Sequence, residues 1–261
     1  MKRLRKAERM TVFESLIDVK SRRGGGFLLL VDPDRLPERK MLRLSEQAEK
    51  CEVDAILIGS SFVISSNFHC IVKEVKEHTN LPVIVFPGSH SQISRHADAI
   101  LFSSLISGRN PQYLIDEQVK GAPLVKEYGL ETIPTAYILI DSGNQTSVQF
   151  ISNTQPIPAD KADIACAHAL AAQYLGMKLI YLEAGSSALN SVPEKLISAV
   201  ADYISLPLVV GGGIRTPDEA EKKILAGASF VVVGSQFEKD DDMVLLREFA
   251  SAAHPLEKVA I

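Results

Sequence analysis

The most reactive pair of side chains in this sequence stands at the end of the apolar run 179–182, where one residue separates Tyr181 from Glu183. Because side chains alternate along a β-strand, the two would lie on the same side of a strand that ends here. A carboxylate on the inner side of a barrel is costly unless it is paired or functional. Glu183 could then accept a proton from a substrate hydroxyl, and Tyr181 could offer a ring face or a hydroxyl. The alternative is a core tyrosine beside a salt-bridged glutamate.

A second group of polar side chains follows the apolar run 27–31, as Asp32-Pro33-Asp34. The next apolar run, 55–58, ends in Gly59-Ser60-Ser61, which brings small residues and hydroxyls to the same end of a neighbouring strand. Carboxylates with few other protein ligands suit Mg²⁺, which keeps several waters and shares the phosphate oxygens of a substrate. These residues therefore indicate a magnesium site. The alternative is an Asp-Pro-Asp turn in which Asp34 caps a helix.

Two glycine loops near the end of the chain favour a phosphate ligand. Gly211-Gly212-Gly213 follows the run 208–210, and Thr216-Pro217 then has the pattern of a helix N-cap and its first residue. Gly234-Ser235 follows the run 230–233 and leads into a second helix-like stretch. Glycines let a ligand approach backbone N–H groups closely, and helix N-termini attract anions. Either loop could instead be only a tight turn.

The elements that must hold these residues alternate between strand and helix along the whole chain, which predicts a parallel sheet covered by helices. We expect eight strands, at residues 27–31, 55–58, 82–86, 99–102, 135–140, 179–182, 208–210 and 230–233. Helical patterns cover residues 10–20, 36–50, 111–126, 161–175, 191–203 with Ser191 as its cap, 216–226 and 241–253. With 261 residues, 46% of them hydrophobic, the chain has the length of one TIM (β/α)₈ barrel. We therefore predict an α/β fold in a single domain over residues 1–261.

Two segments depart from an ideal barrel. Residues 87–96 are too few for an ordinary outer helix between the third and fourth strands, so the wall is expected to be open or thin there. Residues 141–158 are polar with a β-like centre at 148–151, and we interpret them as a hairpin or ordered loop at the barrel mouth. Long loops on that face commonly shape a substrate site.

The composition narrows the class of protein and its compartment. A net charge of −4, with one basic cluster at residues 2–6, argues against nucleic-acid binding. The three cysteines, Cys51, Cys70 and Cys166, are scattered and read as buried thiols in a reducing compartment. No apolar run reaches the ~18 residues of a membrane span, and the N-terminus lacks a secretory pattern. We expect a cytoplasmic protein.

The motifs together resemble those of the geranylgeranylglyceryl phosphate synthases, and most closely the second of that family's two groups. The resemblance covers residues 29–238 and rests on the motifs at 31–34, 54–61, 86–89, 105–111, 133–137, 181–186, 211–215 and 233–235. The family has a modified TIM barrel in which the outer helix after the third strand is lost or replaced, in keeping with the short segment 87–96. Three places depart from the family pattern: Leu30, where some members carry a lysine, Ser60-Ser61, where many have Gly-Gly-Ser or Gly-Thr, and Ser187, where many carry glycine.

The resemblance implies a Mg²⁺-dependent prenyltransferase that joins sn-glycerol 1-phosphate to geranylgeranyl diphosphate through an ether bond. It implies that Asp32 and Ser61 hold the Mg²⁺, that Glu183 is the general base, and that Tyr181 lies near the allylic carbon. The pocket for glycerol phosphate would be lined by Tyr181, Leu182, Glu183, Ala184, Gly185, Ser186 and Ser187. The phosphate itself would be bound by backbone N–H groups of Gly212, Gly213, Gly234 and Ser235.

Other functions remain open from the sequence. One is a heptaprenylglyceryl phosphate synthase, which would use a longer prenyl chain. Another is a different phosphate-binding barrel enzyme, such as an isomerase or an aldolase, although the lysine candidate, Lys178, stands at the wrong end of its strand. A third is a barrel that binds phosphates without turnover. We also expect a homo-oligomer, a dimer or hexamer, and possible peripheral contact with a membrane, since the product is a lipid.

Overall fold

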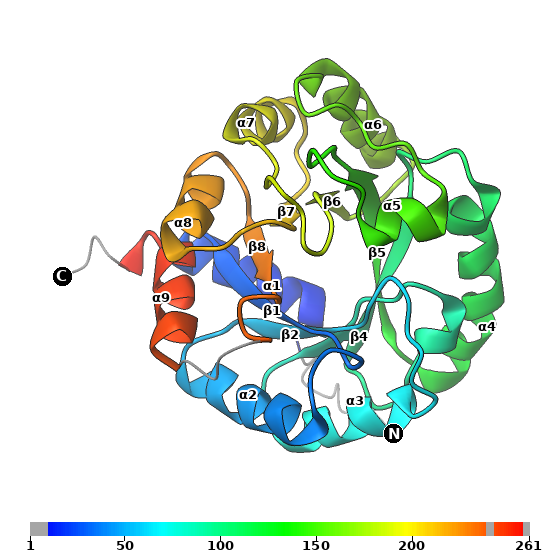
Figure 1. Ribbon diagram of the computed structural model, residues 1–261, viewed down its shortest axis with the longest axis vertical. Coiled ribbons are helices and arrows are strands. Elements are labelled where there is room, and N and C mark those ends of the chain that lie inside the picture. Colours follow the sequence, from blue (N-terminus) through cyan, green and yellow to red (C-terminus); the bar gives the residue numbers. More distant parts are fainter. Residues whose placement is uncertain (1–9, 239–242, 258–261) are drawn as a thin grey trace, which may run out of the picture.

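A computed structural model describes residues 10–238 and 243–257, and its centre is a closed barrel of eight parallel strands (Figure 1). The strands follow one another in chain order, and β1 closes the barrel by pairing with β8, Gly26 opposite Phe230. The predicted TIM barrel is therefore confirmed. The strands are β1 (Gly26–Val31), β2 (Ala55–Ile58), β3 (Val83–Val85), β4 (Ala99–Leu105), β5 (Glu131–Leu139), β6 (Leu179–Glu183), β7 (Leu208–Gly211) and β8 (Phe230–Val233).

Helices form a ring around this barrel in Figure 1. The longer ones are α2 (Glu38–Lys50), α3 (Phe68–Glu77), α4 (Glu117–Tyr128), α6 (Ala162–Tyr174), α7 (Glu194–Tyr203), α8 (Pro217–Leu225) and α9 (Met243–Ala253). Three short elements accompany these helices: a 3₁₀ turn η1 (His90–Gln92), a π-helical turn η2 (Gln112–Asp116) and α5 (Ser147–Ser152). Helix α1 (Val12–Arg23) precedes the first strand.

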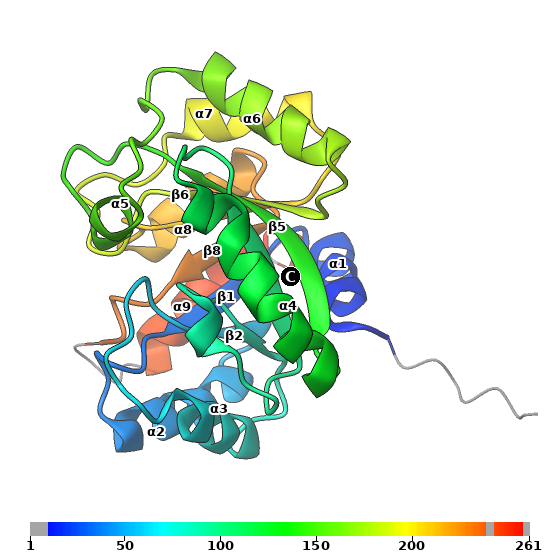
Figure 2. The same ribbon diagram turned by 90° about the vertical axis from the view of Figure 1, so that its right-hand side faces the viewer.

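The core has two layers because every strand is buried on both faces. In β2, Leu57 packs inside the barrel, while Ile56 and Ile58 pack between the barrel and its helices. Helix α1 joins the inner layer through Leu16, so it closes the amino end of the barrel. Figure 2 shows α1 and α5 at opposite ends of the barrel, which leaves the carboxyl ends of the strands as the open mouth.

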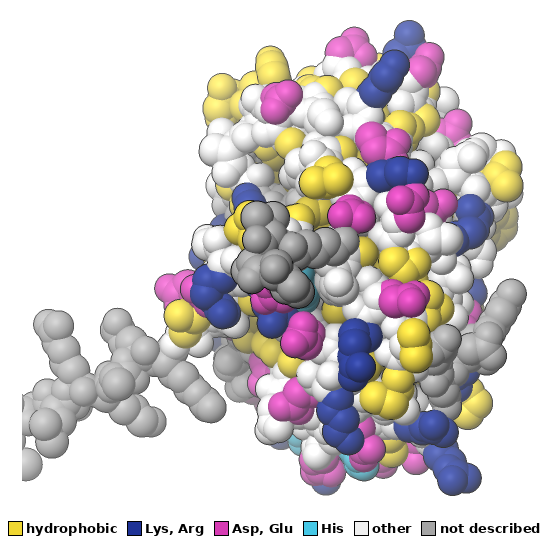
Figure 3. Space-filling view, turned by 90° about the vertical axis from the view of Figure 1, so that its left-hand side faces the viewer, with side chains coloured by type: hydrophobic (Ala, Val, Ile, Leu, Met, Phe, Trp, Pro, Cys, Tyr) yellow, Lys and Arg dark blue, Asp and Glu magenta, His cyan; other side chains and the backbone are white. Residues whose placement is uncertain are grey.

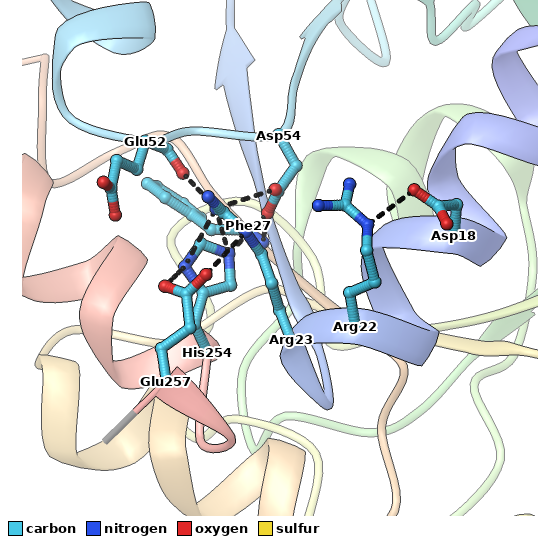
Figure 4. Close-up of polar contacts among 8 residues, drawn as sticks. All are labelled: Asp18, Arg22, Arg23, Phe27, Glu52, Asp54, His254 and Glu257. Carbon is cyan, nitrogen blue, oxygen red and sulfur yellow. Dashed lines mark hydrogen bonds and ion pairs between the residues drawn. The ribbon is translucent and has the colours of Figure 1, made fainter. Parts of the chain in front are cut away.

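A buried polar network ties the last helix to the closed end (Figure 4). Asp54 accepts hydrogen bonds from the Phe27 backbone N–H at 2.7 Å and lies 2.8 Å from the Nε2 atom of His254. The Nη1 atom of Arg23 lies 3.4 Å from Asp54 Oδ1, and its Nε atom lies 3.0 Å from Glu257 Oε1. Because Asp54 and His254 are both almost fully buried, losing either partner would leave a buried polar group unpaired.

Three expectations about local structure were wrong. The segment 141–158 lies at the barrel mouth as an ordered loop, which was one of its two interpretations, but its centre is the helix α5 and not a β-like hairpin. Its apolar residues Val148 and Ile151 are three positions apart, which places both on one face of a helical turn toward the cavity. Helix α7 begins at Glu194 and not near Ser191, because the residue before Pro193 is disfavoured in helical conformation.

The third wrong expectation concerns the cysteines, of which Cys51 is buried, Cys166 is partly buried and Cys70 is exposed. All three thiols are free. Helix α3 was not expected. The last predicted helix, 241–253, corresponds to α9, and its first two residues, 241 and 242, lie outside the described residues. The segment 87–96 contains only the turn η1, as predicted for the missing outer helix.

The outer surface carries charges of both signs. On the side formed by α2, α8 and α9, Figure 3 shows Lys, Arg, Asp and Glu side chains interspersed among hydrophobic ones. This mixture agrees with the small net charge of the chain. None of the described helices is long and apolar enough to cross a membrane.

Candidate active site

A cavity of about 350 Å³ opens at the carboxyl ends of the strands, where the sequence placed the reactive residues. Its lining comes from the ends of β1 to β8 and from the loops that follow them. Catalytic groups of barrel enzymes lie at this end because eight strands deliver their loops to one place. The cavity is therefore the candidate active site.

Glu183 is the central carboxylate of this cavity and is 6% exposed. It shares the inner side of β6 with Tyr181, as alternation predicted. The Gly185 backbone N–H donates a hydrogen bond to its Oε1 atom at 2.6 Å. Burial raises the pKa of Glu183 from 4.5 to about 7, and the Gly185 hydrogen bond and the nearby Tyr181 hydroxyl oppose that rise. None of the described basic side chains forms an ion pair with Glu183, so the salt-bridged alternative is excluded.

An aromatic layer lies beneath the carboxylate. The ring of Tyr181 stacks on Phe86 at a centroid distance of 5.1 Å and on Tyr137 at 5.4 Å. Burial, followed by the nearby Glu183 carboxylate, raises the pKa of both tyrosines well above 10. Both hydroxyls therefore stay protonated at neutral pH. The Tyr181 hydroxyl is fully buried beside Gly211 and has no hydrogen-bond partner among the described residues.

The glycine loop after β7 packs against Glu183. Gly212 and Gly213 have φ of +81° and +71°, in the left-handed region that favours glycine. A Cβ atom on Gly212 would lie 2.3 Å from Glu183 Oε1, so this position has no room for a side chain. Thr216 accepts a hydrogen bond from the Glu219 N–H and caps α8, which confirms the predicted N-cap.

The loop after β8 begins with a turn, and the next described helix is α9, which starts at Met243. The Phe237 N–H bonds back to the Gly234 carbonyl at 2.9 Å, and Gly234 and Ser235 line the cavity. This loop therefore offers backbone N–H groups to the cavity.

The candidate metal ligands line the same cavity, at the ends of β1 and β2. Asp32 lies 3.4 Å from the Nε atom of Arg35, which is a loose ion pair. Asp34 accepts hydrogen bonds from the Ile64 and Ser65 N–H groups at 2.6 and 3.1 Å, so its role is to hold the loop after β2. One carboxylate and the Ser61 hydroxyl, beside an open cavity, fit an ion that keeps several waters, as Mg²⁺ does.

The stretch 181–187 divides into two sets. Tyr181, Glu183, Gly185, Ser186 and Ser187 line the cavity. The side chains of Leu182 and Ala184 instead pack outward among the helices. Ser187 has φ of +60°, a conformation that suits glycine better than serine.

Sequence reasoning missed an apolar arm of the cavity. Ile100 and Phe102 line it from the outer face of β4, with Ile93 beside η1 and Gly121 of α4 opposite. This arm passes outside the barrel where the outer helix after β3 is absent. Its only sequence signal was the short segment 87–96.

A hydrogen-bonded pair closes the outer side of this arm. Glu117 accepts from the His90 backbone N–H and lies 2.7 Å from His90 Nδ1. Both residues line the cavity.

One other group of metal-ligating side chains occurs in the described part of the chain, namely Glu52, His254 and Glu257 at the closed end of the barrel. Arg23 forms an ion pair with Glu257 and contacts His254, so its guanidinium already supplies positive charge there. A metal ion does not fit this network.

The sequence profile of the PcrB family matches residues 17–253. The chain belongs to the PcrB family. Its relatives include a geranylgeranylglyceryl phosphate synthase of Chitinophaga pinensis, 44% identical over 93% of this chain and 96% of the relative. The enzyme of that name in Thermococcus kodakarensis is 44% identical over 90% of this chain and 93% of its own.

The fold of this PcrB-family chain is similar to a solved relative, (S)-3-O-geranylgeranylglyceryl phosphate synthase from Thermoplasma acidophilum in complex with its substrate sn-glycerol 1-phosphate. The two superpose with a TM-score of 0.89 at 36% identity, over 95% of this chain and all of the other.

Proposed function

We propose that this chain is a geranylgeranylglyceryl phosphate synthase, which joins sn-glycerol 1-phosphate to geranylgeranyl diphosphate through an ether bond and releases diphosphate. The observation that carries the proposal is the buried Glu183 with a pKa of about 7, set between glycine loops and an aromatic-lined cavity. The names of its relatives support it, as does the substrate in the solved Thermoplasma structure.

Glycerol phosphate would bind at the polar end of the cavity. Backbone N–H groups of Gly212, Gly213, Gly234 and Ser235 are proposed to hold its phosphate. Ser186 and Ser187 would surround the glycerol moiety. The bound hydroxyl then lies near Glu183.

The chemical step needs a base and a loosened leaving group. Glu183 takes the proton of the attacking hydroxyl, a new bond forms between that oxygen and the allylic carbon, and the bond from this carbon to the diphosphate oxygen breaks. Bound Mg²⁺, held by Asp32 and Ser61, would supply positive charge that stabilises the departing diphosphate. Tyr181 would lie near the allylic carbon, within the aromatic layer that it forms with Phe86 and Tyr137.

The prenyl chain would occupy the apolar arm. Phe86, Ile93, Ile100 and Phe102 present hydrocarbon surface along this path, which favours a long apolar substrate and keeps water from the reacting carbon. An aldolase is not supported, because no described lysine lines the cavity and Lys178 stands before β6 at the closed end, near Phe13 of α1.

The assembly and surroundings of the protein are part of the proposal. Tyr174, Leu175 and Tyr203 are exposed at the ends of α6 and α7, which supports a dimer or hexamer. Phe62 and Ile64 are exposed at the cavity mouth, which supports peripheral contact with a membrane. The three free thiols support a cytoplasmic location. Light scattering and vesicle sedimentation test the first two.

The test of the function is turnover with sn-glycerol 1-phosphate, Mg²⁺ and prenyl diphosphates of increasing length, with products read by mass spectrometry. An ether product that peaks at the geranylgeranyl length is expected. A peak at the heptaprenyl length would reassign the chain to that reaction. No product at any length, with glycerol phosphate still bound, would refute the transferase.

A further inference from the structure

The loops after β2 and β3 press their backbones together at the cavity mouth. A Cβ atom on Gly59 would lie 1.9 Å from the Phe86 carbonyl oxygen, and one on Gly88 would lie 2.3 Å from the Ser60 carbonyl oxygen. The ladder between the two strands ends where the Phe86 N–H donates to the Ile58 carbonyl at 2.9 Å. Beyond that point another group must hold the loop that carries Ser61.

That group is the side-chain amide of Gln92, in the turn η1. Its Nε2 donates to the Ser60 carbonyl at 2.9 Å, and its Oε1 accepts from the Ser60 N–H at 3.3 Å. The same Oε1 atom accepts from the Gly88 N–H at 3.2 Å. Gln92 is 2% exposed and does not line the cavity.

These contacts fix both backbone groups of Ser60 as a neighbouring strand would. Ser61 is the next residue, so the direction in which it enters the cavity depends on the peptide that Gln92 holds. We propose that Gln92 is a positioning residue for the end of the cavity that binds diphosphate and metal. The inference rests on the proposed function in assigning Ser61 to that end.

The amide is the side chain that suits this task. It offers a donor and an acceptor in one plane, whereas glutamate offers acceptors only and methionine offers no strong hydrogen-bonding group. The turn η1, which stands where the outer helix is absent, places the Gln92 amide within hydrogen-bond distance of the loop after β2. Within the described residues, the Gln92 side chain forms hydrogen bonds with Ser60 and Gly88 and with none of the loops after β6, β7 and β8 that are proposed to bind glycerol phosphate. Its loss should therefore affect one substrate and not the other.

The experiment compares Gln92→Met with Gln173→Met. Gln173 is a matched control because its Oε1 accepts from the N–H and hydroxyl of Ser205 at 2.8 and 3.1 Å, before β7 at the closed end. Removing a residue that orients a metal ligand costs about 10–100-fold in metal affinity or activity. We expect Gln92→Met to raise the KM for prenyl diphosphate and the Mg²⁺ half-saturation by about tenfold or more. The KM for sn-glycerol 1-phosphate should stay unchanged, as should all three values in Gln173→Met.

A binding measurement separates this inference from the proposed function. Calorimetry with inorganic pyrophosphate and Mg²⁺ should show weaker binding to Gln92→Met than to wild type, whether or not the protein turns over prenyl diphosphates. If Gln92→Met does not fold, Gln92→Glu replaces it in the same measurement. A glutamate can still accept from the Ser60 and Gly88 N–H groups, but it cannot donate to the Ser60 carbonyl. Unchanged pyrophosphate binding in a folded variant, or an equal loss for both substrates, would overturn the positioning role.

Discussion

Replacing Glu183 by glutamine should abolish most of the activity and at the same time stabilise the fold. The substitution keeps the shape of the side chain, and the Gly185 N–H can still donate to its oxygen. It removes the group that accepts a proton, so turnover should fall by about 10²–10⁴-fold. The new amide can also donate to the unpartnered Tyr181 hydroxyl.

The gain in stability follows from the pKa of Glu183. The folded state raises this pKa from 4.5 to about 7, so it holds the proton more tightly than the unfolded chain does. The stabilisation that the folded state gains from binding this proton is therefore complete below pH 4.5 and is lost as the pH rises through 7. The difference between a pKa of 4.5 and one of about 7, at 1.36 kcal/mol per pKa unit, corresponds to a loss of about 3 kcal/mol in the free energy of unfolding above pH 7. For a chain of this size that is roughly 6–12 °C in Tm.

Thermal unfolding of both proteins at pH 5 and pH 8 measures this difference. Glu183→Gln should unfold at a higher temperature at pH 8, and much of the advantage should disappear at pH 5. The control is Glu131→Gln, since that carboxylate accepts from the Val12 and Phe13 N–H groups and lies at the closed end. It should keep wild-type turnover and gain no stability.

The pH dependence of turnover provides an independent check. The wild-type kcat/KM should fall as the pH drops below about 7, because protonated Glu183 cannot accept the hydroxyl proton. Full turnover by Glu183→Gln, or an acid limb absent down to pH 5, would refute the assignment of the base.

Three further substitutions test the remaining parts of the site. Gly212→Ala should weaken the binding of sn-glycerol 1-phosphate, measured by calorimetry, by at least about tenfold, because the new Cβ has no room beside Glu183. The control is Gly129→Ala, which also has a positive φ, +67°, but faces open space. It should cost only about 1 kcal/mol of stability. Wild-type affinity in Gly212→Ala would contradict the proposed phosphate loop. Asp32→Asn should raise the Mg²⁺ half-saturation by at least about tenfold, and an unchanged Mg²⁺ requirement would exclude it as a ligand. Phe102→Ala should shift the product profile toward longer prenyl chains, because it removes a ring from the apolar arm, and an unchanged profile would count against that path.

The barrel strands were predictable because strands of a parallel barrel are buried on both faces and read as continuous apolar runs. The runs 55–58 and 230–233 match β2 and β8 at both ends. Strand β4 extends past the predicted residue 102 to Leu105, since Ser103 and Ser104 broke the apolar run. The Ser104 hydroxyl is satisfied by donating to the Leu114 carbonyl, a contact that no local pattern shows.

The errors arose where tertiary contacts outweighed local preference. In α5, the β-branched Val148 and Ile151 favoured a strand, and a shared helical face against the cavity determined the outcome. Helix α3 was missed although Phe68, Ile71, Val72 and Val75 carry a helical spacing and are all buried.

Within the site, strand alternation was more reliable than a contiguous motif. It placed Tyr181 and Glu183 together, and it also explains why Leu182 and Ala184 point away from the cavity. The apolar arm was beyond sequence reasoning. Ile100 and Phe102 lie on the outer face of β4, which a helix covers in an ordinary barrel, so their exposure to a ligand depends on an element that is missing.

The raised pKa of Glu183 constrains how a phosphate can be recognised in this cavity. A lysine or arginine beside the carboxylate would favour its ionised form and lower its pKa toward the usual range. Among the described lining residues the one lysine or arginine is Arg35, which lies next to Asp32 and Glu238. Neutral backbone N–H groups bind an anion without adding a full positive charge. Glycine loops are therefore the kind of phosphate site that is compatible with a base of pKa about 7 in the same cavity, and this compatibility accounts for Gly212 packing directly against Glu183.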